Sequence, residues 1–407
     1  MMRTHDVLIV GGGLVGASLA IALDHLDLDV GLVEAAPSGA LPAVFDERNL
    51  SFADATVNAL QALGVLQKLR APMGAITRIH ASRQGDFGRV RLTAAEYGRE
   101  AFGRVVVARD FGEALEARLG ELLRLTRYRP ARFIGIDDDS SDDSGDLRKV
   151  RIADATGEHD LQAKLLVAAD GTHSNVRDAL GIAADTHDYL QTLFVARLRA
   201  ERAPDGTAYE RLGKDGPMAL LPRGDRHFGV VHGVAREVAS QVQALDDGAF
   251  LDRLQQAFGW RVGRFLSVGA RSVYPAIRVV AQRTTAARAV LVGNAAQTLH
   301  PIGAQGFNLG LRDALTLAEL VGTHGGDPGD AGLLEAHAAR RMEDSLRTLA
   351  MTDGLARLTA NDAPLMRPLR SLGLLALDRL PSAQALLVGG AMGYRGEVPA
   401  LCRNDTP

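Results

Sequence analysis

The first 34 residues alternate apolar runs with a glycine turn. A mainly apolar, strand-like segment covers 6–10, and the turn Gly11-Gly12-Gly13 follows it. Apolar residues then recur at helical spacing from Leu14 to about Leu26, and a second strand-like segment covers 29–34. Strand, turn, helix and strand in this order predict the βαβ unit of a doubly wound parallel sheet. The expected fold class is therefore α/β, with a Rossmann-like domain at the start of the chain.

The pattern changes after this unit. Helical spacing of apolar residues recurs over 51–63 and 105–125, whereas 76–92 alternates between apolar and polar residues as strands do. Residues 181–274 favour β structure, with short strands expected at 194–198, 219–222 and 228–231. The chain is expected to leave the first domain and build a second, β-rich one.

Later segments return to the first pattern. The acidic, serine-rich stretch 137–146 is expected to form a solvated hairpin loop. Two short buried strands, 164–169 and 289–292, end in Asp-Gly and Gly-Asn, and a helix over 306–320 follows the second. We therefore expect a discontinuous Rossmann-like FAD-binding domain (1–72, 105–180 and 280–330), an interleaved β-rich substrate domain (73–104 and 181–279) and a helical C-terminal region (331–407).

Composition narrows the class of protein. The 407 residues are 46% hydrophobic and 23% charged, as in a folded chain of about two or three domains, and the net charge of -3 disfavours a nucleic acid partner. Cys402 is the only cysteine and the histidines do not cluster, so we expect a reducing compartment and no metal. No uncharged apolar stretch reaches 18 residues, which predicts a cytoplasmic protein, with peripheral contact to the inner membrane left open.

The glycine turn has the spacing of a dinucleotide-binding fingerprint. Gly11 permits the tight turn, Gly13 lets the backbone approach a pyrophosphate, and Gly16 allows close packing of helix on strand. Glu34 follows Gly16 by 18 residues (34 − 16), where a carboxylate accepts hydrogen bonds from ribose hydroxyls. These residues predict a dinucleotide without distinguishing FAD from NAD.

Two further segments decide between these cofactors. Residues 169–177 read Ala-Asp-Gly-Thr-His-Ser-Asn-Val-Arg, and residues 293–310 read Gly-Asn-Ala-Ala-Gln-Thr-Leu-His-Pro-Ile-Gly-Ala-Gln-Gly-Phe-Asn-Leu-Gly. Together with the fingerprint, they resemble the motifs of the class A flavin aromatic hydroxylases, the family of p-hydroxybenzoate hydroxylase, over most of the chain. Segments 297–301, 303–308 and 216–222 are similar to the ubiquinone-biosynthesis subgroup, in particular the 2-polyprenyl-6-methoxyphenol hydroxylases.

The resemblance implies bound FAD and NAD(P)H as a transient co-substrate. Backbone N–H groups of a helix opened by residues 306–308 are expected to face the N1 and C2 carbonyl edge of the reduced flavin. For Arg48 and Arg109 the alternative is a surface arginine. The residues expected to bind the cofactor are Gly11, Gly13, Gly16, Glu34, Arg48, Arg109, Asp170, Gly171, Arg177, Asn294, Gly303, Gly306, Phe307 and Asn308.

The sequence departs from the family at two places. The usual Gly-Asp reads Gly293-Asn294, and an asparagine still hydrogen-bonds a ribitol hydroxyl but supplies no charge. The methoxyphenol subgroup looks similar at this position. Where the family often has Val-Trp, this chain has Val230-Val231-His232, so substrate contacts are not carried over from that segment.

Pro301, Gln305 and His300 are the candidate catalytic residues. Pro301 stiffens the loop that approaches the flavin, and the alternative for His300 is a packed, hydrogen-bonded residue. The expected reaction is reduction of FAD by NAD(P)H, addition of O₂ at the flavin C4a and transfer of oxygen from the hydroperoxide to a prenylated phenol, with other ubiquinone-biosynthesis proteins as further partners.

Several alternatives stay open at this point. One is a hydroxylase of the same family acting at another ring position or on a soluble phenol, and another is a non-catalytic assembly subunit that holds FAD, supported by Asn294 alone. A halogenase or prenyl reductase is less favoured, because the halogenase Trp-x-Trp-x-Ile motif is absent and Trp260 is the single tryptophan. The apolar, arginine-punctuated stretch 364–392 is expected either to lie on a membrane or to pack on the core.

Overall fold

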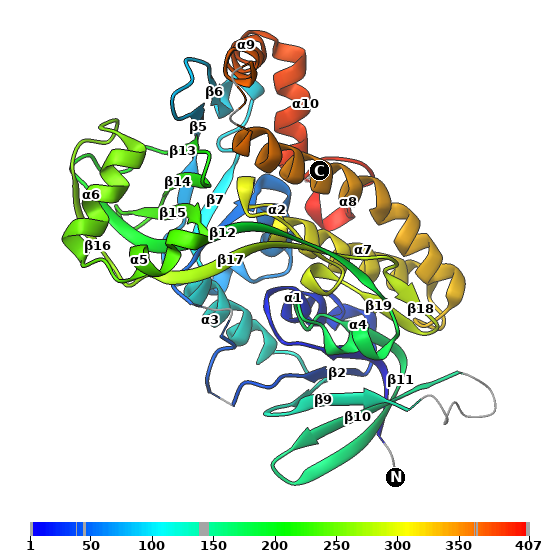
Figure 1. Ribbon diagram of the computed structural model, residues 1–407. Helices are drawn as coiled ribbons and strands as arrows, with labels where there is room; N and C mark the ends of the chain where they lie inside the picture. The colour runs from blue at the N-terminus through cyan, green and yellow to red at the C-terminus, as the bar shows by residue number, and fades with distance from the viewer. Residues whose placement is uncertain are drawn as a thin grey trace.

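The computed structural model describes residues 3–37, 39–43, 46–137, 146–361, 363 and 365–403 (Figure 1). In this part of the chain three sheets carry the architecture, and segments far apart in sequence share each of them. No helix of the described residues is both long and apolar enough to cross a bilayer.

The first sheet has the order β18-β19-β11-β1-β2-β8, with β10 and β9 attached beyond β11. Its central strands run parallel, so Val7 of β1 lies between Leu165 of β11 and Val30 of β2. Apolar residues of β1 are buried on both faces, which explains the unbroken apolar run at 7–10. The strands are β1 (Arg3–Val10), β2 (Val30–Val33), β8 (Leu125–Tyr128), β9 (Arg132–Ile136), β10 (Arg148–Asp154), β11 (Gly157–Ala168), β18 (Thr285–Ala286) and β19 (Ala289–Leu291).

Helices pack on one face of this sheet. Val7 and Ile9 share a core with residues of α1, α2, α3 and α7, whereas Leu8 and Val10 pack against β9 and β10 on the other face. These helices and the short α4 are α1 (Leu14–Ala22), α2 (Asp54–Ala62), α3 (Ala108–Leu119), α4 (Asn175–Ala179) and α7 (Gly306–His324).

The second sheet has the order β20-β17-β12-β15-β14-β13-β5-β6, with β16 beside β12. One face packs on α6, where Phe194 and Phe228 meet Phe250, and the other face reaches α10 through Ala208 and Val388. The strands are β5 (Arg78–Arg83), β6 (Arg89–Thr93), β12 (Ala184–Ala200), β13 (Thr207–Leu212), β14 (Pro217–Pro222), β15 (Phe228–Ala235), β16 (Phe265–Val268), β17 (Ser272–Ala281) and β20 (Gln297–Thr298).

A small third sheet lies between these two. It has the order β3-β7-β4, from β3 (Asn49–Ala53), β4 (Gly74–Ile76) and β7 (Gly103–Val107). The remaining helices are α5 (Ala239–Gln243), α6 (Asp247–Phe258), α8 (Ala331–Ala360), α9 (Met366–Arg379) and α10 (Pro381–Ala391), and α9 and α10 stand beside β5 and β6 in Figure 1.

The α/β fold class is confirmed, but several expected elements were wrong in detail. Residues 103–107 form a strand, and the helix expected over 105–125 is limited to 108–119, because Val105 and Val106 pair with β3. Residues 49–53 are likewise a strand before α2. The short strand expected at 194–198 is part of the 17-residue β12, and α5 and α6 interrupt the stretch expected to be β-rich. The hairpin loop expected at 137–146 falls mainly on residues outside the described part.

Candidate functional site

Three loops meet at the carboxyl edge of the first sheet. β1, β11 and β19 are neighbouring parallel strands, so the loops that follow them emerge side by side. Ala169 N donates to Val10 O at 2.8 Å, and Val292 N donates to Ala168 O at 3.0 Å. The structure therefore brings together the glycine fingerprint, the Asp-Gly segment and the Gly-Asn segment, which lie far apart in sequence.

The glycine loop fits tightly against its neighbours. Gly11 has φ +106°, and a Cβ there would lie 2.4 Å from Ala169 O; a Cβ on Gly16 would lie 1.9 Å from Gly11 O. Gly13 caps α1 without a side-chain hydrogen bond, so the first N–H groups of this helix are open to an anion. Glu34 accepts hydrogen bonds from Gly12 N at 2.8 Å and Ala36 N at 2.7 Å, which hold its carboxylate beside the loop.

The Asp170 segment is a small hydrogen-bonded turn. Gly171 has φ +87°, a conformation that favours glycine. Asp170 accepts from Ser174 Oγ and from Val176 N, and burial raises the pKa of its carboxyl although these hydrogen bonds act against the shift. Ser174 in turn caps α4 by accepting from Arg177 N at 2.9 Å.

Arg177 joins the second and third loops. Its Nη1 donates to Thr172 O and to Ala295 O, both at 3.2 Å, and the side chain is buried. Its Nε has no hydrogen-bond partner among the described residues. Thr298 Oγ1 also donates to Thr172 Oγ1 at 2.9 Å. The geometry makes Arg177 a residue that positions both loops.

The Gly293 loop is anchored to α7 by a residue that was not predicted from the sequence. Asp313 of α7 is buried and accepts from Gly293 N at 3.3 Å and from Gln297 Nε2 at 2.7 Å. Its other oxygen accepts from Arg341 Nε at 2.8 Å. Asn294 itself is exposed at the site. The signal in the sequence was a charged pair, Arg312-Asp313, within the mainly apolar stretch 309–318 of α7.

His300 is buried with both ring nitrogens occupied. Ile302 N donates to Nδ1 at 3.3 Å, so Nε2 carries the proton and donates to Gln191 Oε1 at 3.1 Å. Burial lowers the pKa of His300 to about 4, which keeps the ring neutral at physiological pH. These contacts fix the loop against β12, and a catalytic role for His300 stays a prediction.

The loop after His300 combines a turn with open space. Gly303 has φ +72° and Ala304 has φ +51°, and no atom lies within 4 Å of a Cβ built on Gly303 or Gly306. Gln305 is buried, and its Nε2 donates to Gly303 O at 3.0 Å, so this side chain shapes the turn. α7 begins here without a side-chain cap, which leaves its first N–H groups available to a planar ligand with negative charge on one edge. Pro301 is exposed next to this space.

Asn308 holds the start of α7 in place. Its Oδ1 accepts from Ala53 N at 2.9 Å and Thr56 Oγ1 at 2.8 Å, and its Nδ2 donates to Ser51 O and Ala304 O. The amide therefore has no capacity left for a ligand. Phe307 packs between Phe52 and Phe111. Both residues stand as supports of the loop, and their expected direct contacts to a cofactor stay predictions.

Arg48 and Arg109 lie apart from the three loops' hydrogen-bond network. Arg48 Nε pairs with Asp46 at 2.8 Å, and its guanidinium lies 4.3 Å from the ring centroid of Tyr274. Burial disfavours ionisation of Asp46, but hydrogen bonds from Arg48 and Tyr274 outweigh it and lower the pKa of that carboxyl. Arg109 pairs with Glu47. Their expected contacts to FAD stay predictions.

A second residue missed from the sequence is Glu210 of β13. Side chains alternate along a strand, so Glu210 faces the same side as Ala208, which packs near α10, and Leu212, which packs with Ile302. It has no hydrogen-bond partner among the described residues, and burial raises the pKa of its carboxyl to about 7. A carboxyl that titrates near neutrality, between the 301–304 turn and α10, is suited to accept a proton. The alternation of 207–212 was the signal that placed it on this face.

This geometry fits a dinucleotide with a flat, electron-rich end. A glycine cradle that a Cβ would fill and two uncapped helix starts, α1 and α7, lie along one edge of the sheet. The helices contact through Gly310, whose added Cβ would lie 3.0 Å from Val15 Cγ2. A pyrophosphate suits the start of α1, and a flavin edge suits the start of α7.

Comparisons with known proteins agree with this geometry. A protein family described as an FAD binding domain matches residues 4–349. The ubiquinone hydroxylase UbiL of Rhodospirillum rubrum is 34% identical over 395 residues, which cover 96% of this chain and 90% of that protein. The 3-demethoxyubiquinol 3-hydroxylase of Escherichia coli is 28% identical over 383 residues, which cover 92% of this chain and 95% of that protein.

The fold itself recurs among solved structures. The p-nitrophenol 4-monooxygenase PnpA from Pseudomonas putida matches with a TM-score of 0.79 at 18% sequence identity, covering 98% of this chain and 100% of that one. At this level of identity the likeness speaks for the fold alone.

Proposed function

Since the chain belongs to the FAD-dependent aromatic monooxygenases, in the group that includes the ubiquinone hydroxylases, we propose that it hydroxylates the ring of a polyprenylated methoxyphenol in ubiquinone biosynthesis. The observation that carries the proposal is the meeting of the glycine cradle, the Asp170 turn and the uncapped start of α7 at one sheet edge. When bound, FAD supplies hydride acceptance from NAD(P)H and activation of O₂.

Residues of the chain bind the parts of FAD and position the loops around it. The N–H groups at the start of α1 bind pyrophosphate, and Glu34 accepts from the ribose. Asp170 holds the turn of the second loop, Arg177 joins this loop to the third, and Asp313 anchors the third to α7. Gly303 and Gly306 leave room for the flavin ring, and Pro301 and Gln305 shape the turn beside it.

Glu210 is the residue to which we assign the phenol proton. Ionising the phenol makes its ring a better electron donor to an electrophilic oxygen. A carboxylate with a pKa of about 7 is half ionised at neutral pH and can accept this proton. Glu210→Gln should therefore lower kcat with little change in KM for NAD(P)H, and it should remove a limb near pH 7 from the kcat profile. An unchanged profile would assign the proton to another group.

The test of the proposed function compares substrates. Purified protein reconstituted with FAD should oxidise NAD(P)H faster with a prenylated methoxyphenol than with its unprenylated analogue, and mass spectrometry should find one added oxygen in the product. Equal turnover of both phenols would favour the hydroxylase of a soluble phenol. FAD binding without NAD(P)H oxidation by any phenol would favour the assembly subunit.

A prenylated substrate resides in a membrane, and α9 offers a surface to meet it. Leu365, Leu369 and Leu372 are 77%, 60% and 58% exposed and follow one another at helical spacing. Arg367 lies between the first two of these leucines and Arg379 follows them, and both arginines are exposed. We propose that this face contacts the inner membrane peripherally, so that the prenyl tail can enter near α10.

Substitution tests this contact better than truncation, because Met392 and Cys402 belong to the core and would be lost with the tail. The triple variant Leu365→Ser, Leu369→Ser, Leu372→Ser should lose flotation with lipid vesicles. Met342→Ser with Leu346→Ser, two equally exposed residues of α8, is the matched control and should float as before. Equal flotation of all three proteins would exclude α9 as the contact.

A further inference from the structure

A cavity lies at the end of strands β5 and β13 of the β-rich sheet, between α6 and α9. It has a volume of about 590 Å³ and is bounded by the β13–β14 turn, α6, the end of β5 and the start of α9. Alternation along β13 fixes the side: Leu212 packs with Ile302 beside the flavin loop, whereas Arg211 lines the cavity. His232 of β15 lines it too and contacts Phe250 of α6. Arg83 is in register with Leu212, so the cavity takes one wall from each face of the sheet where β5 and β13 end.

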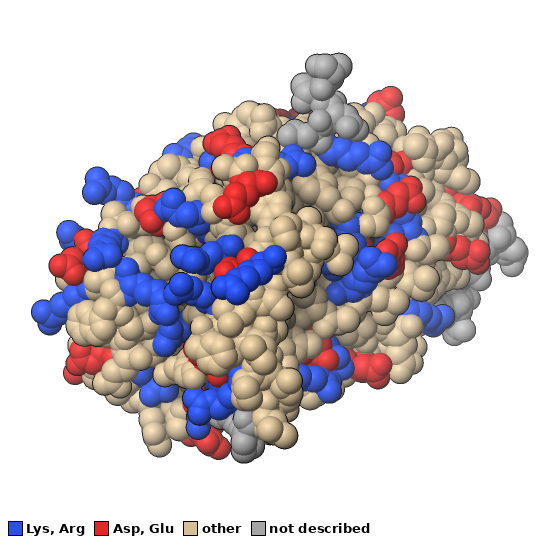
Figure 2. All heavy atoms as spheres, turned by 90° about the horizontal axis from the view of Figure 1, so that it is seen from above, with Lys and Arg blue, Asp and Glu red and all other residues tan. Residues whose placement is uncertain are grey.

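The lining is strongly basic. Five cationic side chains, Arg83, Arg211, Lys214, Arg253 and Arg367, face one carboxylate, that of Asp215. Figure 2 looks down on the α9 end of the molecule and shows Lys and Arg side chains gathered on its left half. The net charge of the lining is +4 (5 − 1), in a chain whose net charge is -3. This local excess opposes the sign of the whole molecule and favours an anion.

Three of the five cations have no ion pair among the described residues. They are Arg211, Lys214 and Arg253, whereas the other two pair with Asp86. Arg211 uses Nε to donate to Ala257 O at 2.9 Å, and Arg253 uses Nε to donate to His232 Nε2 at 3.2 Å. Both contacts leave the terminal guanidinium nitrogens available. Burial and the nearby positive charge of Arg261 lower the pKa of Arg211. This is the direction expected for a guanidinium whose charge is not compensated by a neighbouring acid.

His232 supports this arrangement as a neutral group. It is buried, and burial together with the charge of Arg253 lowers its pKa to about 4. A neutral ring that accepts at Nε2 carries its proton on Nδ1, and this nitrogen has no partner in the described part of the chain. An imidazole that stays neutral orients Arg253 without adding to the positive charge.

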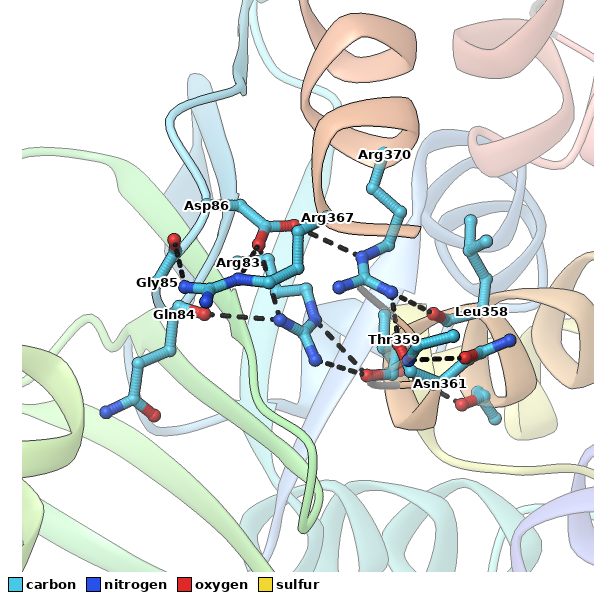
Figure 3. A network of polar contacts seen from close by, with 11 residues as sticks. Arg83, Gln84, Gly85, Asp86, Leu358, Thr359, Asn361, Arg367 and Arg370 are labelled. Atoms are coloured by element: carbon cyan, nitrogen blue, oxygen red, sulfur yellow. Dashed lines mark hydrogen bonds and ion pairs between the residues drawn. The ribbon is translucent and has the colours of Figure 1, made fainter. Parts of the chain in front are cut away.

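The opposite wall is rigid and also positive. Asp86 is fully buried and is shared by Arg83 at 3.4 Å, Arg370 at 3.1 Å and Arg367 at 3.8 Å (Figure 3). Arg83 also donates to Thr359 O at 3.0 Å, so its guanidinium is held in one orientation. Three arginines around one carboxylate leave this wall with a charge of +2 (3 − 1). A fixed guanidinium wall loses little entropy when an anion binds.

We propose that this cavity binds the phosphate group of a phosphate-bearing ligand. Arginine presents planar pairs of N–H donors that match phosphate oxygens, and here arginines come from both walls. The volume exceeds that of a single phosphate and leaves room for a second group of the ligand beside it. Two sources share this chemistry: an anionic phospholipid headgroup, reached because Arg367 lies between the exposed Leu365 and Leu369, or a free phosphorylated compound. The inference concerns a site separate from the flavin and does not rest on the proposed hydroxylation.

The test uses the full chain with FAD bound and inorganic pyrophosphate as the soluble probe. Calorimetric titration at low salt should give saturable binding, weakened by added salt. The double variant Arg211→Gln, Arg253→Gln should raise the dissociation constant at least about tenfold. The matched double control Arg124→Gln, Arg347→Gln removes two exposed arginines elsewhere and should stay within about twofold. Asp215→Asn should tighten binding, a gain that misfolding does not produce.

Vesicle sedimentation distinguishes the two sources. If phosphatidylglycerol in phosphatidylcholine vesicles increases binding of the parent protein but not of the double variant, the ligand is a lipid headgroup. If vesicle binding is equal while pyrophosphate binding differs, the ligand is a free phosphate compound. If neither probe distinguishes the double variant from its control, the proposal is wrong. Flavin absorbance and NAD(P)H oxidation in the same samples report the proposed function separately.

Discussion

Asp313→Asn tests whether the buried charge of α7 supports cofactor binding. The two carboxylate oxygens of Asp313 act only as acceptors. They accept hydrogen bonds from Gly293 N, Gln297 Nε2 and Arg341 Nε. An asparagine has the same shape but one acceptor oxygen, so its NH₂ must face either the loop or the guanidinium. In both orientations the buried NH₂ group of the asparagine faces another hydrogen-bond donor, so that donor loses its acceptor.

The magnitude follows from what remains after the change. A buried hydrogen bond to a charged group contributes about 1.5–3 kcal/mol, and breaking a buried ion pair costs about 3–5 kcal/mol. Arg341 keeps Asp344 at 2.6 Å, which places the cost near the lower end of the second range. We expect the free energy of unfolding to fall by about 3 kcal/mol and FAD to bind about tenfold more weakly, since Asn294 lies in the loosened loop.

The assay is urea unfolding of the apoprotein together with titration of FAD by its fluorescence. Glu343→Gln is the matched control, because it removes a carboxylate of α8 that pairs with Arg347 on the surface, and its effect should stay within about 0.5 kcal/mol. If Asp313→Asn unfolds at the same urea concentration as the control and binds FAD equally well, Asp313 does not support the loop and the reasoning fails.

Three further predictions concern the pH dependence of stability and the retention of FAD. Glu210→Gln should stabilise the protein by about 3 kcal/mol at pH 8 and not at pH 4, because a carboxyl whose pKa is raised by folding makes the protein lose stability as pH rises from 4.5 to about 7; urea unfolding at both pH values checks this. The parent protein should lose stability as pH falls from 6.5 to about 4, because His300 and His232 are held neutral, and His300→Gln should reduce this slope in the same assay. Gly16→Ala should abolish FAD retention during purification, because its Cβ would lie 1.9 Å from Gly11 O, whereas Gly354→Ala, with open space in α8, should fold normally and retain FAD.

Local patterns predicted the fold best where they are strongest. The apolar run, glycine turn and helix at 6–22 appear as β1 and α1, because both faces of β1 are buried and the turn allows only glycine at Gly11 and Gly16. The segment 103–107 failed for the opposite reason. Its valines favour a strand only because β3 and β4 pair with it, and that pairing is not visible in a short window.

The residues of the candidate site also fall into two groups, those that a local motif marks and those that it does not. Motif residues such as Gly11, Asp170 and Gly293 could be found because each sits at the end of a buried strand. Asp313 and Glu210 were missed, because their local signals are weak and their surroundings are formed by residues distant in sequence. Asn308 shows the reverse: the motif is recognisable, but only the structure shows that its amide is fully used within the protein.

The strand order of the first sheet constrains how the protein is made. β1 pairs with β11, whose partner residues lie some 158 positions later, and β11 then pairs with β19 near residue 290. Tyr394 donates to Asp54 at 2.8 Å, so α2 contacts a residue 340 positions later in the chain. Contacts this distant in sequence form slowly, and a domain whose parts are synthesised at different times stays incomplete on the ribosome. The contacts around the flavin site are thus complete only when residues as late as Tyr394 are available, and production of active protein should respond to chaperones and temperature more strongly than its final stability suggests.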